Sequence, residues 1–178
     1  DLVATLPPAR CLYRLEGNDT DAGPLLPAAK LERIESDWRD LLDGLWGIMR
    51  EESGFNPGVE SSANAVGLMQ LILPTAKRMA ELTKEDEGTV TLATLTDPRV
   101  SVRLGARYLQ HVLDQVGGRA ALPILPAGYN AGEGALKRWL KARGDMPLDL
   151  FVEHMTFEEA RWYTKRVVSS YATYRFLY

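Results

Sequence analysis

The most constraining feature of the sequence is an amphipathic stretch that ends in an acid on its apolar side. Leu41, Leu45 and Ile48 recur at spacings of four and three, which predicts a helix with one apolar face. The same spacing, continued by four residues, reaches Glu52. An ionised carboxylate is costly to bury unless it is paired or protonated, so an acid at this position needs an explanation. Its neighbour Glu51 lies about a third of a turn away and can face solvent.

The helix is expected to end directly after Glu52. Gly54 suits a left-handed C-terminal cap, and residues 56–58 (NPG) cannot continue a helix. Glu52 would then lie in the last turn, where apolar surroundings and the negative end of the helix dipole both disfavour its ionised form. Both effects raise the pKa of the carboxyl toward the range that a general acid needs near neutral pH. The alternative is that Glu52 is only the last polar residue of a frayed helix.

The residue types in the segment after this helix indicate a functional site. Residues 61–65 (SSANA) form a small polar loop that can approach a ligand closely. Residues 67–70 (GLMQ) then bring a glutamine beside apolar residues, and Pro74 opens a new helix.

In their order along the chain, these pieces resemble the catalytic domain of the soluble lytic transglycosylases, lysozyme-like enzymes that cleave peptidoglycan. The resemblance covers roughly residues 46–178. Each motif is weak by itself, but the ordered set is specific. The motifs are Glu52-Ser53, GLMQ at 67–70 with Thr75-Ala76, Asp97-Pro98, Leu104-Gly105 with Tyr108-Leu109, GYNAG at 128–132, and Glu153 with Phe157-Glu158 and Arg161.

The resemblance implies an all-α fold of the lysozyme-like kind shared by goose-type lysozymes and transglycosylases, with an active-site cleft beside the helix of Glu52. At 178 residues and 46% hydrophobic, the chain suits one domain with a sizeable core. We expect the catalytic domain to span residues 37–178. Residues 1–36 are rich in turn signals and are expected to be a loop-rich extension or the remnant of an upstream region.

The resemblance also implies a single catalytic residue, Glu52. It places six residues at the substrate: Ser61, Met69, Gln70, Tyr129, Asn130 and Glu153. Tyr129 would orient Glu52 or contact the sugar, and Asn130 would help hold the site. Glu153 would lie across the cleft in a supporting role, although it could equally be a helix-entry residue.

The implied reaction cleaves the β-1,4 bond between N-acetylmuramic acid and N-acetylglucosamine without water. Glu52 protonates the glycosidic oxygen and then takes the proton of the muramyl 6-hydroxyl, which attacks C1 and closes a 1,6-anhydro ring. Ordinary glycosidases use two carboxylates, and no second acid is obvious beside Glu52. Two alternatives stay open: a hydrolytic lysozyme resembling the goose type, and a non-catalytic peptidoglycan-binding scaffold.

The sequence departs from the family at a few positions. Glu51 stands where the family often has glutamine, and its carboxylate could either raise the pKa of Glu52 further or face water. Asn64 replaces a frequent glycine, which is tolerable because asparagine adopts the left-handed region readily. Ile72-Leu73 replaces a methionine before Pro74, so one contact that relatives make to substrate is in doubt. Residues 155–156 replace an Ile-Pro pair at the rim of the expected cleft.

Composition excludes several other classes of function. The net charge of -3, with Lys and Arg scattered among acids, argues against nucleic-acid binding. Cys11 is the only cysteine, and His111 and His154 lie far apart, so we expect no disulfide framework, no metal and no cofactor. No leader or membrane span is visible. We expect a monomer, and the resemblance places it in the periplasm.

The rest of the chain predicts further helices. They are expected to start at Pro74, after Asp97, at Ala135 and at Thr156, with extended or loop structure at 89–96 and 144–150. Gly105 is expected to allow close packing of its helix against another. Trp139 and the aromatic stripe of the last helix are expected to be chiefly core.

Overall fold

The structure is a computed structural model that describes residues 44–116 and 124–177. All of them belong to one compact unit, Asp43–Tyr178. The expectations for residues 1–36, for Cys11 and for the start of the Glu52 helix lie outside the described residues.

The described part of the chain is mostly helical, which confirms the all-α class. It begins with the helix at 44–53, followed by a short antiparallel pair, β1 and β2, in which Val66 opposes Leu71. The elements in order are β1 Ala65–Val66, β2 Leu71–Ile72, α3 Leu73–Leu82, η2 Glu87–Thr89, α4 Leu92–Leu95, α5 Pro98–Gln115, α6 Ile124–Ala131, α7 Glu133–Arg143, α8 Leu148–Glu153 and α9 Glu158–Leu177.

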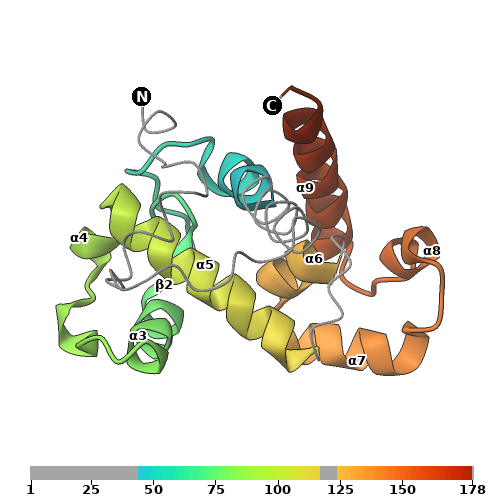
Figure 1. Ribbon diagram of the computed structural model, residues 1–178, viewed down its shortest axis with the longest axis horizontal. Coiled ribbons are helices and arrows are strands. Elements are labelled where there is room, and N and C mark those ends of the chain that lie inside the picture. The colour runs from blue at the N-terminus through green and yellow to red at the C-terminus, as the bar shows by residue number, and fades with distance from the viewer. Residues whose placement is uncertain (1–43, 117–123, 178) are drawn as a thin grey trace, which may run out of the picture. The chain divides into compact units, whose positions relative to one another are not determined.

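Helix α6 lies at the centre of the fold and packs against α5, α7 and α9 (Figure 1). Its sequence, ILPAGYNA, is apolar on most sides, as a central helix requires. Pro126 is tolerated because it lies in the first turn, where the backbone N–H has no partner within the helix. A Cβ at Gly128 would lie 2.5 Å from Val112 Cγ1 and 2.7 Å from Leu136 Cδ2, so only glycine lets α5 and α7 approach this closely.

One apolar cluster joins α5, α6, α7, α8 and the start of α9. Trp139 is 4% exposed within it, which confirms its expected place in the core. Its ring nitrogen Nε1 donates a hydrogen bond to Thr156 Oγ1 at 2.9 Å, so the indole is buried without leaving its polar atom unpaired. Phe151, Val152 and Met155 belong to the same cluster.

Most of the expected helix starts are confirmed. Pro74 is in the first turn of α3, and Asp97 caps α5 by accepting a hydrogen bond from the Arg99 backbone N–H at 2.8 Å. Gly105 does allow close packing, but its neighbour is a loop residue rather than a helix. A Cβ there would lie 2.6 Å from Met69 Cγ.

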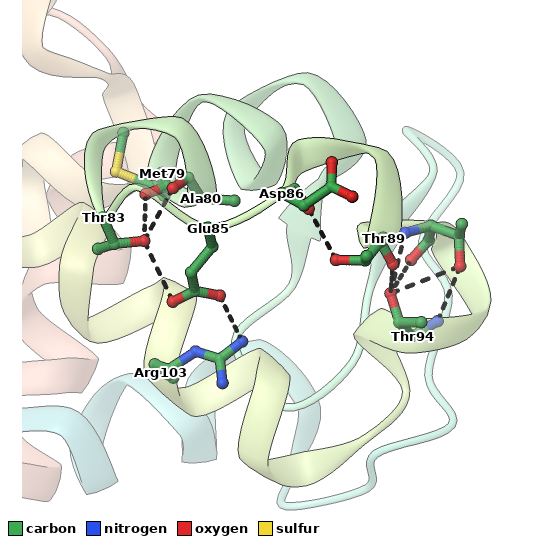
Figure 2. Close-up of polar contacts among 9 residues, drawn as sticks. Met79, Ala80, Thr83, Glu85, Asp86, Thr89, Thr94 and Arg103 are labelled. Carbon is green, nitrogen blue, oxygen red and sulfur yellow. Dashed lines mark hydrogen bonds and ion pairs between the residues drawn. The ribbon is translucent and has the colours of Figure 1, made fainter.

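The expectation of extended structure at 89–96 is wrong. Thr91 and Thr94 form a capping box that starts α4, with the Thr94 backbone N–H bonded to Thr91 Oγ1 at 3.1 Å. The alternating threonines that suggested a strand therefore act as caps and turn residues. Figure 2 shows Thr94 beside Thr89 at this turn.

The acidic run before this turn is bound to α5 at one point. Glu85 Oε2 pairs with Arg103 at 2.8 Å, and Glu85 Oε1 accepts a hydrogen bond from Thr83 Oγ1 at 3.1 Å (Figure 2). Asp86 accepts from the Gly88 backbone N–H at 2.9 Å and caps η2. The expected loop at 144–150 is also partly wrong, because α8 begins at Leu148 and buries Phe151 and Val152.

Candidate active site

The helix at 44–53 carries Glu52 to a position against α9. Leu45 and Ile48 are buried, as their spacing predicted. Gly47 permits the close approach of the two helices, since a Cβ there would lie 3.0 Å from the carbonyl oxygen of Val167 in α9. Gly54, at φ 57°, ends the helix in the left-handed conformation, and its N–H binds the Arg50 carbonyl at 3.0 Å, which confirms the expected cap.

The carboxyl of Glu52 has a hydrogen-bond partner that the sequence did not reveal. The hydroxyl of Tyr163 in α9 donates to Glu52 Oε1 at 2.6 Å, and Tyr163 is only 4% exposed. The aromatic stripe of α9 predicted Tyr163 as a core residue. The available signal was its hydroxyl, because a buried tyrosine oxygen requires a partner.

The environment of Glu52 perturbs its acidity strongly. The pKa of Glu52 is raised from 4.5 to about 7, chiefly by burial; the hydrogen bond from Tyr163 lowers it, and the charges of Glu51 and Glu159 raise it further. The predicted direction of the shift is confirmed. A carboxyl with this pKa is present in both protonation states near neutral pH, so it can give a proton in one step and take one in the next.

Of the two alternatives left open for Glu51, the structure supports the first, because the charge of Glu51 raises the pKa of Glu52 and its side chain is largely shielded from solvent. Its carboxylate forms an ion pair with Arg166 of α9, with Nε and Oε2 2.6 Å apart. Helix α9 therefore contacts both acids at the end of the helix at 44–53.

The loop at 67–70 is fixed by hydrogen bonds, one of them to the residue that follows Glu52. Ser53 Oγ, next to Glu52, donates to the Leu68 carbonyl at 2.9 Å. The Gln70 side-chain amide donates to the carbonyls of Val59 and Gly67 at 2.9 and 3.0 Å, so the structure gives Gln70 a bracing role within the loop. In the same loop, the Met69 backbone N–H is bonded to Ser101 Oγ at 3.1 Å.

Two of the expected substrate-binding residues make contacts inside the protein, and their contact with substrate stays a prediction. The Met69 side chain is 0% exposed and lies under Gly105, so it packs in the core behind the loop. The hydroxyl of Tyr129 donates to the Met69 carbonyl at 2.7 Å, whereas the tyrosine hydroxyl that binds Glu52 is that of Tyr163. Tyr129 is also close to the acid. Burial is the main cause that raises the pKa of Tyr129, and the charge of Glu52 is the next largest.

The remaining candidates lie around this centre. Ser61 Oγ accepts from the Ala63 and Ala65 backbone N–H groups, which shapes the turn before β1, and Asn130 is half-buried beside Tyr129 in α6. Asn64 has φ 58°, as its tolerance of the left-handed region predicted. Glu153 ends α8 rather than starting a helix; its carboxylate is exposed and pairs with Lys165 Nζ at 2.5 Å, which lowers its pKa.

Within the described ranges, no three His, Cys, Asp or Glu side chains are grouped so that they could hold a metal ion. The helices of those ranges also include none that is long and apolar enough to cross a membrane.

Comparison with known proteins decides the family. The sequence model of one protein family, the transglycosylase SLT domain, matches residues 31–151. The chain belongs to the transglycosylase SLT domain family. This confirms the resemblance that the ordered motifs indicated.

The SLT domain is similar to curated relatives along most of its length. It is 36% identical over 130 residues to the soluble lytic murein transglycosylase of Escherichia coli strain K12, covering 72% of this chain and 20% of the relative. It is 38% identical over 126 residues to the putative soluble lytic murein transglycosylase of Haemophilus influenzae, covering 68% of this chain and 20% of the relative. The chain thus spans about a fifth of the length of these relatives.

Solved structures show the same fold for the SLT domain. The 70 kDa soluble lytic transglycosylase of Escherichia coli matches with a TM-score of 0.69 at 35% identity, covering 76% of this chain and 22% of that one. An inactive mutant of a lytic transglycosylase from Pseudomonas aeruginosa matches with a TM-score of 0.67 at 32% identity, covering 93% of this chain and 26% of that one. These matches confirm the expected lysozyme-like helical fold.

Proposed function

We propose that this SLT domain is a peptidoglycan lytic transglycosylase in which Glu52 acts first as general acid and then as general base. The observation that carries the proposal is the buried Glu52 carboxyl, with a pKa of about 7 and a 2.6 Å hydrogen bond from Tyr163. The names of the relatives give the substrate class, murein. The inactive Pseudomonas aeruginosa protein carries a glutamate-to-glutamine exchange, so in that relative activity depends on one glutamate.

The geometry suits two successive proton transfers by one carboxyl. Tyr163 donates to Oε1, which leaves Oε2 to carry the acidic proton. Glu52 gives this proton to the glycosidic oxygen as the bond from that oxygen to C1 breaks. The resulting carboxylate takes the proton of the muramyl 6-hydroxyl while O6 bonds to C1, closing the 1,6-anhydro ring and restoring the acid.

The placement of the neighbouring acids favours ring closure over a two-carboxylate mechanism. A retaining glycosidase needs a second carboxylate close to the acid, free to attack the sugar. The carboxylate of Glu51 is occupied by Arg166, and Glu159 is exposed in the first turn of α9. A hydrolytic lysozyme of the goose type, with the same single acid, remains the second candidate.

The proposal extends to the setting of the enzyme. Its substrate would be the glycan strands of peptidoglycan, and its compartment the periplasm, because soluble and membrane-bound murein transglycosylases are among the relatives. The proposed steps use no cofactor, and one copy of the chain supplies every residue in them.

The deciding experiment is mass spectrometry of muropeptides released from purified peptidoglycan. We expect products that end in 1,6-anhydromuramic acid. Products with reducing ends would instead show that the domain is a hydrolytic lysozyme. If no muropeptides were released while binding to the sacculus stayed intact, the domain would be a non-catalytic scaffold.

Replacing Tyr163 by phenylalanine should lower activity by about tenfold, because Glu52 loses the hydrogen bond that orients it. The same bond lowers the pKa of Glu52, so the fall in activity at high pH should move to higher pH in this variant. The pH dependence of kcat/KM measures both effects. Tyr174→Phe on the same helix, where the ring packs edge-on against Trp46, is the matched control. Equal profiles for the two variants would contradict the role of Tyr163.

A further inference from the structure

Two consecutive acids at the end of the helix at 44–53 are each bound by α9. Tyr163 donates to Glu52 Oε1 at 2.6 Å, and Arg166 Nε donates to Glu51 Oε2 at 2.6 Å. Ser170 Oγ lies 3.5 Å from Glu51 Oε1. The three α9 residues are spaced by three and four, so they share one face of α9, and that face contacts both acids.

The close contact of the two helices explains why Glu51 turns toward α9. Gly47 lies one turn before Glu51 on the same face and allows a close approach of α9, because a Cβ there would lie 3.0 Å from the Val167 carbonyl oxygen. The side chain of Glu51 is 15% exposed, whereas that of Arg166 is 54% exposed. A shielded carboxylate is costly without a cationic partner, and Arg166 provides that partner from the solvent side.

We infer that Glu51 and Arg166 form a positioning pair whose two charges act on the catalytic carboxyl in opposite senses. The Glu51 carboxylate, next to that carboxyl on the same helix, disfavours a second negative charge there, and Arg166, which binds Glu51 from α9, offsets part of this repulsion. This inference rests on the proposed function. It also gives a role to an acid that stands where the family often has glutamine.

The groups around Glu52 set the direction of the expected effects. On its own helix, Glu51 raises the pKa of Glu52; on α9, Glu159 raises it and the Tyr163 hydroxyl lowers it. From α6, Tyr129 is near enough for its own pKa to respond to the charge of Glu52. Removing the charge of Glu51 should therefore lower the pKa of Glu52, and removing its cationic partner should raise it.

The test compares Glu51→Gln with Arg166→Gln. In Glu51→Gln the fall in kcat/KM at high pH should move to lower pH by about 0.5 unit. At pH values above the fall, kcat/KM should therefore be about threefold lower than in the native domain. In Arg166→Gln it should move up, while Arg166→Lys keeps the charge and should restore the native position. Lys165→Gln removes the same charge from α9 at a residue paired with Glu153, and should shift the profile less.

A titration of the Glu52 carboxyl by carbon NMR provides a readout that needs no substrate. It should show the same opposite displacements in Glu51→Gln and Arg166→Gln, with thermal melts verifying that both variants fold. A native domain that releases no anhydromuramyl products would refute the proposed function. A native domain that releases them, with unmoved titrations and profiles in both variants, would overturn the positioning pair alone.

Discussion

Replacing Glu52 by glutamine should reduce the release of anhydromuramyl products by at least about a thousandfold. The same carboxyl is proposed to supply both the acid and the base, and each such role contributes a factor of about 10² to 10⁴. Glutamine keeps the size of the side chain and can still accept the hydrogen bond from Tyr163, so the loss should be one of chemistry and not of folding. Product analysis by mass spectrometry, with sacculus binding measured in parallel, tests this.

The control for this experiment is Glu159→Gln. Glu159 is an exposed acid on α9 whose charge also acts on Glu52, so this variant should keep most of the activity. If Glu52→Gln retained more than about a tenth of native activity, Glu52 would not be the general acid.

The same substitution should stabilise the protein at neutral and alkaline pH. The pKa of Glu52 is about 7 in the folded protein and 4.5 in the unfolded chain, so folding favours the protonated form. The contribution of Glu52 to native stability should then be most favourable below pH 4.5, fall as the pH rises toward 7 and level off above it. Glu52→Gln removes the free-energy cost of holding an ionised carboxylate at this site, which is about 3 kcal/mol above pH 7.

Denaturant unfolding of both proteins at acidic and alkaline pH measures the difference. The two curves should nearly coincide at pH 4 and separate at pH 8. Equal stability at both values would mean that Glu52 is not disfavoured as an ion, and would remove the physical basis of its proposed acidity.

Replacing Gly67 by alanine should destabilise the fold by about 3 kcal/mol or more. Gly67 has φ 83°, and a Cβ there would lie 2.1 Å from the backbone carbonyl oxygen of Leu95 and 2.8 Å from Ser101 Oγ. Moving either atom is costly, because the Leu95 oxygen is part of the backbone and Ser101 Oγ accepts a hydrogen bond from the Met69 N–H. The loop would have to move away from Ser53 and Tyr129, the two residues that connect it to the site.

Gly54→Ala is a matched control for this change. Gly54 also has a positive φ, of 57°, but a Cβ there would meet no atom within 4 Å. It should cost only about 1 kcal/mol, the strain of alanine in the left-handed region. Thermal or denaturant unfolding separates the two, and equal losses would show that the contact with Leu95 is not what requires glycine at Gly67.

The sequence by itself determined the features that depend on neighbours along the chain. The spacing of Leu45 and Ile48 predicted the helix that carries Glu52, Gly54 its end, and Asp97 the start of α5; each needs only residues within a turn or two. The ordered motifs also indicated the family. Where the local pattern was ambiguous, the prediction failed. The alternating threonines at 89–96 suit a strand as well as a helix cap, and the prediction of extended structure there was wrong.

Only the tertiary structure decided which groups act on the acid. Tyr163 and Arg166 reach Glu52 and Glu51 from 111 and 115 residues further along the chain, and no spacing rule encodes a contact at that separation. Periodicity could show that Tyr163 is buried, but not that its hydroxyl meets a carboxyl. In the same way, the motif containing Met69 was visible, while its burial beneath Gly105 arises because α5 packs over the loop and leaves no room at that position for a side chain.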